Sequence, residues 1–453
     1  MRALVYGLAI TGAATVRALL RRDHEVVVVD DSIDDAKDDL ARSLGIELLP
    51  APSDADEFVQ RFDLIVPAPG VPESHPIVTA AQRAGVPLMS EIELGYRWEQ
   101  ERPGGPRPIL AITGTDGKTT TTDMTVAMLR SAGLDVEAVG NTDVPFVDAV
   151  DTDLDVFVIE CSSFRLAWTE RFRADAAVWL NFAPDHLNWH TSLDSYEATK
   201  ARVFTLQAET DVAIGFVDDP VVMRHLAEAP GRRRSFGLDE GDYRRDGTDL
   251  IGPQGPIVDV SVMARSLPHD VTNALAAAAL VLETGLADAA AISDALAGFS
   301  AQPHRLEEVG RDGGVAWYND SKATTPHAAA TAIRAFDSVV LIAGGSRKGV
   351  DLSPMAATDT HVRAVVAIGE AAPDVAAVFA DSTEVVVADS MADAVGLAGT
   401  RAESGDAVVL SPGCASFDWY TGYTARGDDF RRLVSAYLAR PAPADSPPVE
   451  ATA

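Results

Sequence analysis

The segment that decides the fold spans residues 108–120 and reads PILAITGTDGKTT. Its apolar start predicts a buried strand, and the glycine turn that follows leads into a Thr-, Met- and Ala-rich stretch that predicts a helix. Glycines let a backbone fold tightly enough for its N–H groups to point at phosphate oxygens, and a helix N-terminus adds partial positive charge. Strand, turn and helix together predict a phosphate-binding loop.

Different residues of the loop are expected to bind different parts of a nucleotide and its metal ion. Lys118 is placed to reach the β- and γ-phosphates, and the Thr119 hydroxyl is placed to bind Mg²⁺. The usual pattern has a further glycine where this chain has Ile112, so the loop is a shortened version. The expected ATP-binding residues here are Gly114, Thr115, Asp116, Gly117, Lys118, Thr119 and Thr120. A phosphate loop alone leaves kinase, motor ATPase and ligase open.

On both sides of the loop, short β-branched runs alternate with alanine-rich helical stretches. This pattern predicts an α/β protein with parallel sheets covered by helices, divided into three domains. We expect an N-terminal Rossmann-like domain (1–97), a central P-loop ATPase-like domain (98–302), a C-terminal Rossmann-like domain (303–440) and a disordered tail (441–453). Within these, VPLMSE (86–91) is expected to be a strand, WEQERPGGPRP (98–108) a linker, and 231–266 a set of short antiparallel strands.

Composition excludes several classes of protein. The chain has 453 residues, 47% of them hydrophobic, without the roughly 20 uninterrupted apolar residues of a membrane span. Its two cysteines, Cys161 and Cys414, cannot form a disulfide framework and fit a reducing cytosol. The formal charge of −31 opposes binding to nucleic acid. We therefore expect a cytoplasmic protein with neither a membrane nor a nucleic acid as partner.

Two positions after the loop are candidates for chemistry, and a third, taken by itself, is not. Glu160 ends the strand DVFVIE, where a carboxylate beside the phosphate loop can bind Mg²⁺. In NFAPDHLNWH, either Asp185 or His186 could bind a metal, although such a pair often caps a turn. Lys200, on an amphipathic helix, is by itself expected to be solvated and to have no role.

Together these segments resemble the Mur ligases, which build the peptide stem of peptidoglycan, and their folylpolyglutamate synthetase relatives. The resemblance runs from YGLAITG to ARGDDFRRL and implies an ATP-dependent ligase that forms an acyl phosphate and couples it to an amino acid. In ECSSF, DHLNWH and YEATKARVF it implies a Mg²⁺-binding glutamate (Glu160), a second-metal ligand (His186) and a lysine carried as a carbamate (Lys200). It thus implies that Lys118 and these three residues are catalytic, and that two Mg²⁺ ions are bound by Thr119, Glu160, His186 and Lys200.

Motifs later in the chain resemble further binding positions of the family. The resemblance implies nucleotide contacts at Asn273 (VTNALAAAAL), Arg305 (QPHRLEEV) and Asp320 (YNDSKATTPHA), and substrate contacts at Lys322, Thr324 and Lys348 (GGSRKGVDLS).

Other motifs favour the family member that adds D-glutamate to UDP-N-acetylmuramoyl-L-alanine, acting as a monomer. GLAITG resembles its uridine-nucleotide turn, AVGNTDVPF its substrate-contacting segment, and SPGCASFDWYTGYTARGDDF its D-glutamate segment. The substrate contacts implied by these motifs are Ile10, Thr11, Asp30, Asn141, Ser416 and Tyr423. The chain departs from the family pattern with Asp116 and Asp270 where asparagine is common, and with Ala9 where glycine is usual.

Alternatives remain at this stage. The nearest is another Mur-type or folylpolyglutamate-type ligase that adds a different amino acid. A dehydrogenase could be read from GLAITG and Asp30, but the full G-x-G-x-x-G is missing. A kinase or motor ATPase would leave the segments around Asp320 and Ser416 unexplained.

Overall fold

The computed structural model describes residues 1–300, 302–347, 351–357, 359–380 and 382–440. The chain forms two compact units, Met1–Phe299 and Ser300–Ala453, which are described separately. Lys348 and the tail 441–453 lie outside the described residues, so the predictions for them stay predictions. Within the described ranges, no helix is both long and apolar enough to cross a membrane.

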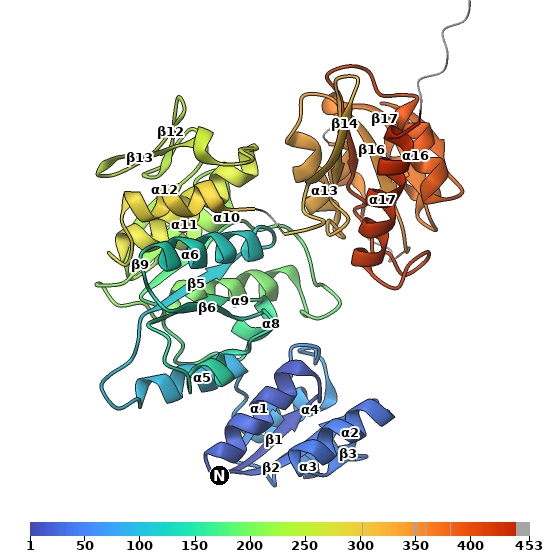
Figure 1. The fold of residues 1–453 in the computed structure, drawn as a ribbon. Helices are drawn as coiled ribbons and strands as arrows, with labels where there is room; N and C mark the ends of the chain where they lie inside the picture. The colour runs from blue at the N-terminus through green and yellow to red at the C-terminus, as the bar shows by residue number, and fades with distance from the viewer. Residues whose placement is uncertain (301, 348–350, 358, 381, 441–453) are drawn as a thin grey trace, which may run out of the picture. The chain divides into compact units, whose positions relative to one another are not determined.

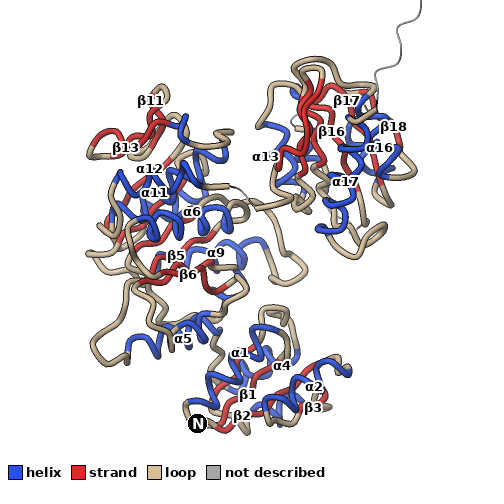
Figure 2. The backbone as a smooth tube through the Cα atoms, in the orientation of Figure 1, coloured by secondary structure: helices blue, strands red, loops and turns tan. Residues whose placement is uncertain are grey.

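The first unit begins with a parallel sheet of order β3-β2-β1-β4, flanked by helices (Figures 1 and 2). Its elements are β1 (Arg2–Tyr6), α1 (Ile10–Arg21), β2 (Glu25–Asp30), α2 (Asp35–Leu44), β3 (Leu48–Pro50), α3 (Ala55–Val59), β4 (Leu64–Pro67), α4 (Pro76–Ala84) and α5 (Glu91–Gln100). The turn after β1 leads directly into α1, as predicted for a Rossmann-like domain.

Two predictions near the end of this region are wrong. VPLMSE forms no strand; Leu88 makes a single bridge to Ile65. The Ser90 side chain accepts a hydrogen bond from the Glu93 N–H, and this cap starts α5 where the strand was expected. The linker expected from residue 98 starts later, because α5 continues to Gln100.

The same unit continues with a six-stranded parallel sheet of order β10-β9-β8-β5-β7-β6 and a three-stranded antiparallel sheet, β11-β12-β13. The elements are β5 (Ile109–Thr113), α6 (Lys118–Ser131), β6 (Val136–Gly140), α7 (Phe146–Ala149), β7 (Val156–Glu160), α8 (Ser163–Leu166), β8 (Ala176–Trp179), α9 (Leu193–Thr205), β9 (Val212–Phe216), α10 (Pro220–Glu228), β10 (Arg232–Phe236), β11 (Arg244–Asp246), β12 (Asp249–Gly252), β13 (Gly255–Asp259), η1 (Val260–Val262), α11 (Pro268–Glu283) and α12 (Ala289–Gly298). The antiparallel strands predicted in 231–266 are confirmed, except that β10 pairs in parallel with β9.

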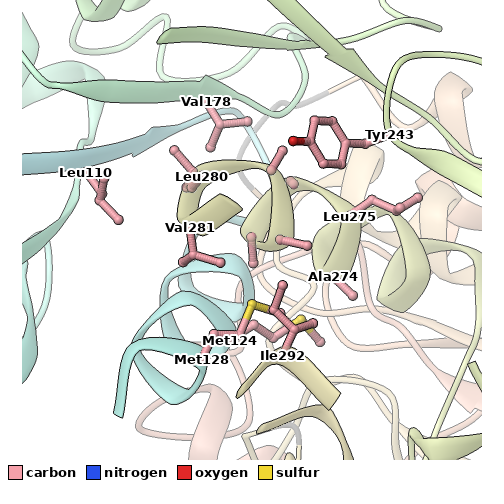
Figure 3. Packing of buried hydrophobic residues seen from close by; sticks show 14 of the residues in the cluster. Leu110, Met124, Met128, Val178, Tyr243, Ala274, Leu275, Leu280, Val281 and Ile292 are labelled. Carbon is pink, nitrogen blue, oxygen red and sulfur yellow. The ribbon is translucent and has the colours of Figure 1, made fainter. Parts of the chain in front are cut away.

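Helices cover both faces of the six-stranded sheet. On one face α6 packs on β5, β6 and β7, and α11 packs on β8, β9 and β10. Figure 3 shows this core, in which Leu280 of α11 lies beside Val178 of β8 and Met124 of α6 lies beside Ile292 of α12. Phe204 of α9 belongs to the core on the other face. Because the sheet is buried on both sides, its strands are continuous apolar runs, and polar groups at their carboxyl ends stand out in the sequence.

The second unit has a six-stranded sheet of order β14-β15-β19-β16-β17-β18, parallel except for β14. Its elements are β14 (Glu307–Asp312), β15 (Val315–Asn319), α13 (Pro326–Arg334), β16 (Val339–Gly344), α14 (Ser353–Ala356), η2 (Asp359–His361), β17 (Val362–Ile368), α15 (Ala372–Phe379), β18 (Glu384–Val387), α16 (Met391–Gly399), β19 (Ala407–Leu410) and α17 (Tyr423–Leu438). The last described helix, α17, packs against β14, β15 and α16 and so covers this part of the sheet.

Candidate active site

The phosphate loop connects β5 to α6, as predicted, and a side chain from the next strand end holds it. The Asn181 Oδ1 accepts hydrogen bonds from the N–H groups of Thr115 (3.0 Å) and Asp116 (2.8 Å). Gly117 has a φ of +82°, and a Cβ there would lie 2.8 Å from Oδ1 of Asn273. A glycine is therefore required at this position, and Asn273 of α11 lies against the loop. Its predicted contact with the nucleotide stays a prediction.

Two lysines converge on one carbonyl of this loop. The Nζ of Lys118 donates to the carbonyl oxygens of Gly114 (2.9 Å) and Thr115 (2.8 Å). The Nζ of Lys200 donates to the same Gly114 oxygen at 2.6 Å and lies 4.8 Å from the centre of the Tyr196 ring. The loop thus gathers two amines beside the place where its N–H groups would receive phosphates.

Lys200 is the clearest departure from what the residues alone indicated. Its side chain is 1% exposed, so the expectation of a solvated lysine is wrong. Burial, and next the positive charge of Lys118, hold the pKa of Lys200 well below its ordinary value. A buried amine of lowered pKa is neutral at a lower pH than an ordinary lysine and is therefore a nucleophile.

Glu160 ends β7, next to β5 in the sheet, and has one oxygen engaged and one open. Its Oε1 accepts a 2.7 Å hydrogen bond from Nδ2 of Asn141. Its Oε2 is buried without a hydrogen-bond partner. A buried carboxylate oxygen in this condition costs free energy unless a cation or a donor meets it. The atom therefore fits a Mg²⁺ ligand.

His186 follows β8, on the loop that leads to α9. Its backbone has a φ of +55°, its Nε2 lies 3.2 Å from Asp185 Oδ2, and its ring lies 4.6 Å from that of Phe164. Burial lowers the pKa of His186, against the opposing effect of Asp185. A neutral imidazole is the form that binds metals.

The protein side chains alone do not build a complete metal cage. In the parts of the chain that the structure describes, no group of three or more His, Cys, Asp or Glu side chains is arranged around a common point. Mg²⁺ commonly combines one or two carboxylates with water and substrate phosphate oxygens. Glu160 and the first turn of α6, which carries Thr119 and Thr120, fit that incomplete type of site.

The turn between β1 and α1 borders a pocket within the first unit. Thr11, Gly12, Ser90, Glu91 and Arg165 are among the residues that line it. Ile10 at the start of α1 is 67% exposed, although it is apolar, and is thus available to a ligand.

Asp30 holds the turn between β1 and α1 in place through hydrogen bonds. Its carboxylate accepts hydrogen bonds from the N–H groups of Leu8 (2.8 Å) and Ser32 (3.0 Å) and from Nζ of Lys37 (2.7 Å). Burial works to raise the pKa of Asp30, but these bonds outweigh it and lower the pKa. Asp30 therefore shapes the turn that was predicted to hold a nucleotide.

The predicted sites of the second unit gather at the carboxyl ends of its strands. Asp320 follows β15, and its Oδ2 accepts a 2.7 Å hydrogen bond from Ser411, which follows β19. The Nζ of Lys322 lies 5.2 Å from the centre of the Tyr423 ring. Ser416 is buried, and its carbonyl oxygen accepts from the N–H of Tyr420.

Two predicted residues in this unit lie beside these segments in the chain. Thr324 donates its N–H to the carbonyl oxygen of Lys322 at 2.8 Å. Arg305 precedes Leu306, whose N–H donates to the Asp320 carboxylate at 3.2 Å.

Arg426, which sequence reasoning passed over, holds the loops of this unit together. Arg426 is 1% exposed, and its guanidinium donates to Oγ and O of Ser321 (both 2.9 Å) and to O of Cys414 (3.1 Å). Burial lowers its pKa to about 10. Nothing in the sequence around Arg426 distinguishes it from the exposed arginines of the same helix.

Replacing Arg426 with methionine leaves the carbonyl oxygens of two loops without their donor. We expect the free energy of unfolding of the second unit to fall by about 3 kcal/mol, since each unsatisfied buried acceptor costs roughly 1–3 kcal/mol. Urea denaturation measured by circular dichroism tests this, with Arg432→Met, an exposed arginine of α17, as control. A loss no larger than that of the control would contradict it.

The family departure at Asp270 has a structural reason. The Asp270 carboxylate pairs with the Arg265 guanidinium at 2.6 Å and accepts from the Leu267 N–H at 3.2 Å, so it caps α11. Asparagine could not make the ion pair. Ala9 precedes α1 without a side-chain cap, which leaves the first N–H groups of α1 to other acceptors.

Lysines are scarce and concentrated in the candidate sites. The sequence has five, at positions 37, 118, 200, 322 and 348, beside 32 arginines. Lys37 holds Asp30, and the other four are predicted site residues. The basic charge elsewhere on this acidic chain comes from arginine.

Comparison with known proteins agrees with this arrangement. Family models match three stretches: "Mur ligase MurD-like, N-terminal domain" at 1–90, "Mur ligase middle domain" at 112–281 and "Mur ligase, glutamate ligase domain" at 304–414. Similar curated proteins include the UDP-N-acetylmuramoylalanine–D-glutamate ligase of Frankia casuarinae, 41% identical over 96% of this chain and 93% of the relative. That of Streptomyces coelicolor is 36% identical over 95% of this chain and 97% of the relative.

Solved structures share the fold at low sequence identity. A pseudomurein peptide ligase type C from Methanothermus fervidus has a TM-score of 0.60 at 16% identity, covering 96% of this chain and 99% of its own. A UDP-N-acetylmuramate–alanine ligase from Thermotoga maritima has a TM-score of 0.57 at 18% identity, covering 97% and 99%. The α/β fold predicted from the sequence is therefore confirmed, and the chain belongs to the Mur ligase family.

Proposed function

We propose that this chain is an ATP-dependent ligase that adds D-glutamate to UDP-N-acetylmuramoyl-L-alanine in the synthesis of peptidoglycan precursors. The observation that carries the proposal is a phosphate loop flanked by a buried carboxylate with one open oxygen, in a chain similar along nearly its whole length to ligases of that name. We further propose that it acts in the cytoplasm as a monomer, without a nucleic acid partner.

The residue roles proposed here are those that the family resemblance implies. The N–H groups at the start of α6 (117–120) and the Lys118 amine bind the ATP phosphates, and Gly114, Thr115 and Asp116 complete the nucleotide-binding loop. Asn273, Arg305 and Asp320 are further nucleotide contacts. Thr119 and Glu160 hold one Mg²⁺, which neutralises phosphate charge when bound. His186 and modified Lys200 hold a second.

The carbamate at Lys200 is supported by the burial and lowered pKa of its amine. The neutral nitrogen attacks the carbon of CO₂, an N–C bond forms, one C–O π bond opens, and a proton leaves to solvent. The product is an anion that supplies oxygen ligands in place of a cation. The 2.6 Å bond from Nζ to the Gly114 oxygen keeps the amine at the loop before it reacts.

Substrate contacts are proposed at both ends of the chain. Ile10, Thr11, Asp30 and Asn141 serve the UDP-sugar, and Lys322, Thr324, Lys348, Ser416 and Tyr423 serve the amino acid. The three domains are proposed at 1–97, 98–302 and 303–440. The first boundary falls within α5 and the second near the division between the compact units at 299/300.

In the proposed reaction, the carboxylate of the L-alanine residue attacks the γ-phosphorus of ATP and ADP leaves, giving an acyl phosphate. The amine of D-glutamate then attacks the acyl carbon to form a tetrahedral intermediate, which loses phosphate to give the amide. The protein contributes position and charge: the loop N–H groups and Lys118 stabilise the transferred phosphoryl group.

The test of the function is phosphate release from ATP by the purified full chain. We expect release only when UDP-N-acetylmuramoyl-L-alanine and D-glutamate are both present, with a new amide product by mass spectrometry. L-Glutamate, L-alanine and L-lysine serve as matched amino acids. Turnover with one of these and none with D-glutamate would favour the alternative, another Mur-type or folylpolyglutamate-type ligase.

A further inference from the structure

A buried arginine links the turn at the first strand to the carboxylate with the open oxygen. Arg165, on the short helix α8, is 4% exposed and donates three hydrogen bonds through three different nitrogens. Nε donates to Glu91 (2.8 Å), NH1 to Oδ1 of Asn141 (2.8 Å) and NH2 to Oγ1 of Thr11 (3.0 Å). Asn141 in turn donates to Oε1 of Glu160 at 2.7 Å.

The direction of these bonds fixes the Asn141 amide. An arginine has no acceptor, so the atom facing NH1 must be the amide oxygen. The amide NH₂ then faces Glu160, whose carboxylate can only accept. The bond occupies Oε1 and leaves Oε2, which is buried and without a partner, as the oxygen presented to a cation.

The charge of Arg165 is already balanced. Its bond to Glu91, whose side chain is 1% exposed, forms a buried ion pair. Arg165 lines the same pocket as Thr11, but its charge is paired with Glu91 and is therefore not available to neutralise a phosphate. Its other two hydrogen bonds, to Asn141 and Thr11, fix the orientation of side chains at two sites.

We infer that Arg165 is a positioning residue that couples occupancy of the turn at Thr11 to metal binding at Glu160, through Asn141. The inference rests on the proposed function, in which Thr11 contacts the UDP-sugar and Glu160 binds Mg²⁺. When a ligand forms a bond with the Thr11 hydroxyl, the guanidinium of Arg165 and the amide of Asn141 shift together. This shift changes the orientation of the Glu160 carboxylate, which binds the metal. The coupling must act equally in both directions, because binding free energies are linked.

The test compares Arg165→Lys with wild type in the full chain. Lysine keeps the charge facing Glu91, but its three N–H donors leave from a single nitrogen and cannot reach the three acceptors that the separate guanidinium nitrogens reach. We expect the half-saturating Mg²⁺ concentration for phosphate release to rise about tenfold or more, the usual size for a residue behind a metal ligand. Arg107→Lys is the matched control: Arg107 is also buried and pairs with Glu99 of the same helix α5, at 2.7 Å. Its Mg²⁺ requirement should stay as in wild type.

A second readout needs no catalysis. Mn²⁺ binding is measured by electron paramagnetic resonance with a non-hydrolysable ATP analogue, with and without UDP, which occupies the turn but lacks the reacting carboxylate. We expect UDP to change the Mn²⁺ affinity about fivefold in wild type and in Arg107→Lys, and to have no effect in Arg165→Lys. Equal coupling in Arg165→Lys and wild type would overturn the inference.

Two further variants keep the outcomes distinct. If Arg165→Lys does not fold, Glu91→Gln with Arg165→Gln replaces the ion pair by two neutral amides, and the same loss of UDP coupling is expected; retained coupling would overturn the inference. Glu160→Gln tests the metal site itself. If Glu160→Gln loses metal binding while Arg165→Lys behaves as wild type, the inference alone fails. If Glu160→Gln binds metal normally, the assignment of Glu160 in the proposed function fails as well.

Discussion

Alanine in place of Lys118 is expected to lower kcat for phosphate release at least about a hundredfold, the usual cost of removing a group that stabilises transition-state charge. In the structure, the Lys118 amine is held by two loop carbonyls, so it stands at the loop before any nucleotide arrives. Alanine removes the charge without removing a core contact. The fold should therefore remain, as judged by circular dichroism and melting temperature.

The control for this variant lies on the same helix. Arg130→Ala, at the far end of α6, removes a cation whose side chain donates to the carbonyl oxygen of Val136. Its kcat should stay close to wild type. A well-folded Lys118→Ala enzyme with near-normal kcat would rule out the phosphate-loop assignment.

Alanine in place of Lys200 should also lower kcat by about a hundredfold or more, because it removes the proposed carbamate oxygens from the metal site. Small carboxylates such as acetate and formate should restore part of the activity, since they can supply an anionic oxygen in the space left by the side chain. The measurement is phosphate release over a series of carboxylate concentrations, with chloride at equal ionic strength as the reference.

The modification itself has a direct readout. Wild type incubated with ¹³C-bicarbonate should give a carbamate signal in ¹³C NMR that Lys200→Ala lacks, and Thr205→Ala, at the exposed end of α9, should keep the signal. Because the lowered pKa of Lys200 leaves its amine neutral at a lower pH than an ordinary lysine, the signal should persist to a lower pH than the carbamate of an exposed lysine. Wild-type activity that is independent of bicarbonate, together with no such signal, would contradict the carbamate.

Local pattern was enough to place the central parts of the site. Thirteen consecutive residues around Lys118 predict the strand, the loop and the start of the helix. Glu160 is recognisable because a carboxylate directly follows an apolar run. In VPLMSE the apolar residues favour a strand, whereas Ser90 caps a helix. Caps act through one side chain and leave little trace in hydrophobic periodicity.

Residues whose surroundings come from distant parts of the chain could not be placed from the sequence. Lys200 looks solvated on its helix, and only packing against the phosphate loop, 86 residues away, buries it. Arg165 meets Thr11 across 154 residues, and Asn181 holds a loop 65 residues earlier. These contacts depend on the order of the strands in the sheet, because that order decides which strand ends lie side by side. A single sequence does not give the strand order.

Because lysines are few and lie near the candidate sites, a reagent that modifies amines labels this chain selectively at those sites. Each lysine that the structure describes is engaged near a candidate site: Lys37 with Asp30, Lys118 and Lys200 with Gly114, and Lys322 with Tyr423. Within the described ranges, an acylating reagent specific for amines therefore reacts with the N-terminus and with lysines near a candidate site, and it does not react with the arginines. Acylation of the partly exposed Lys37, Lys118 and Lys322, followed by mass spectrometry as ligands are added, shows which of these positions each ligand covers; Lys200 is too buried to report.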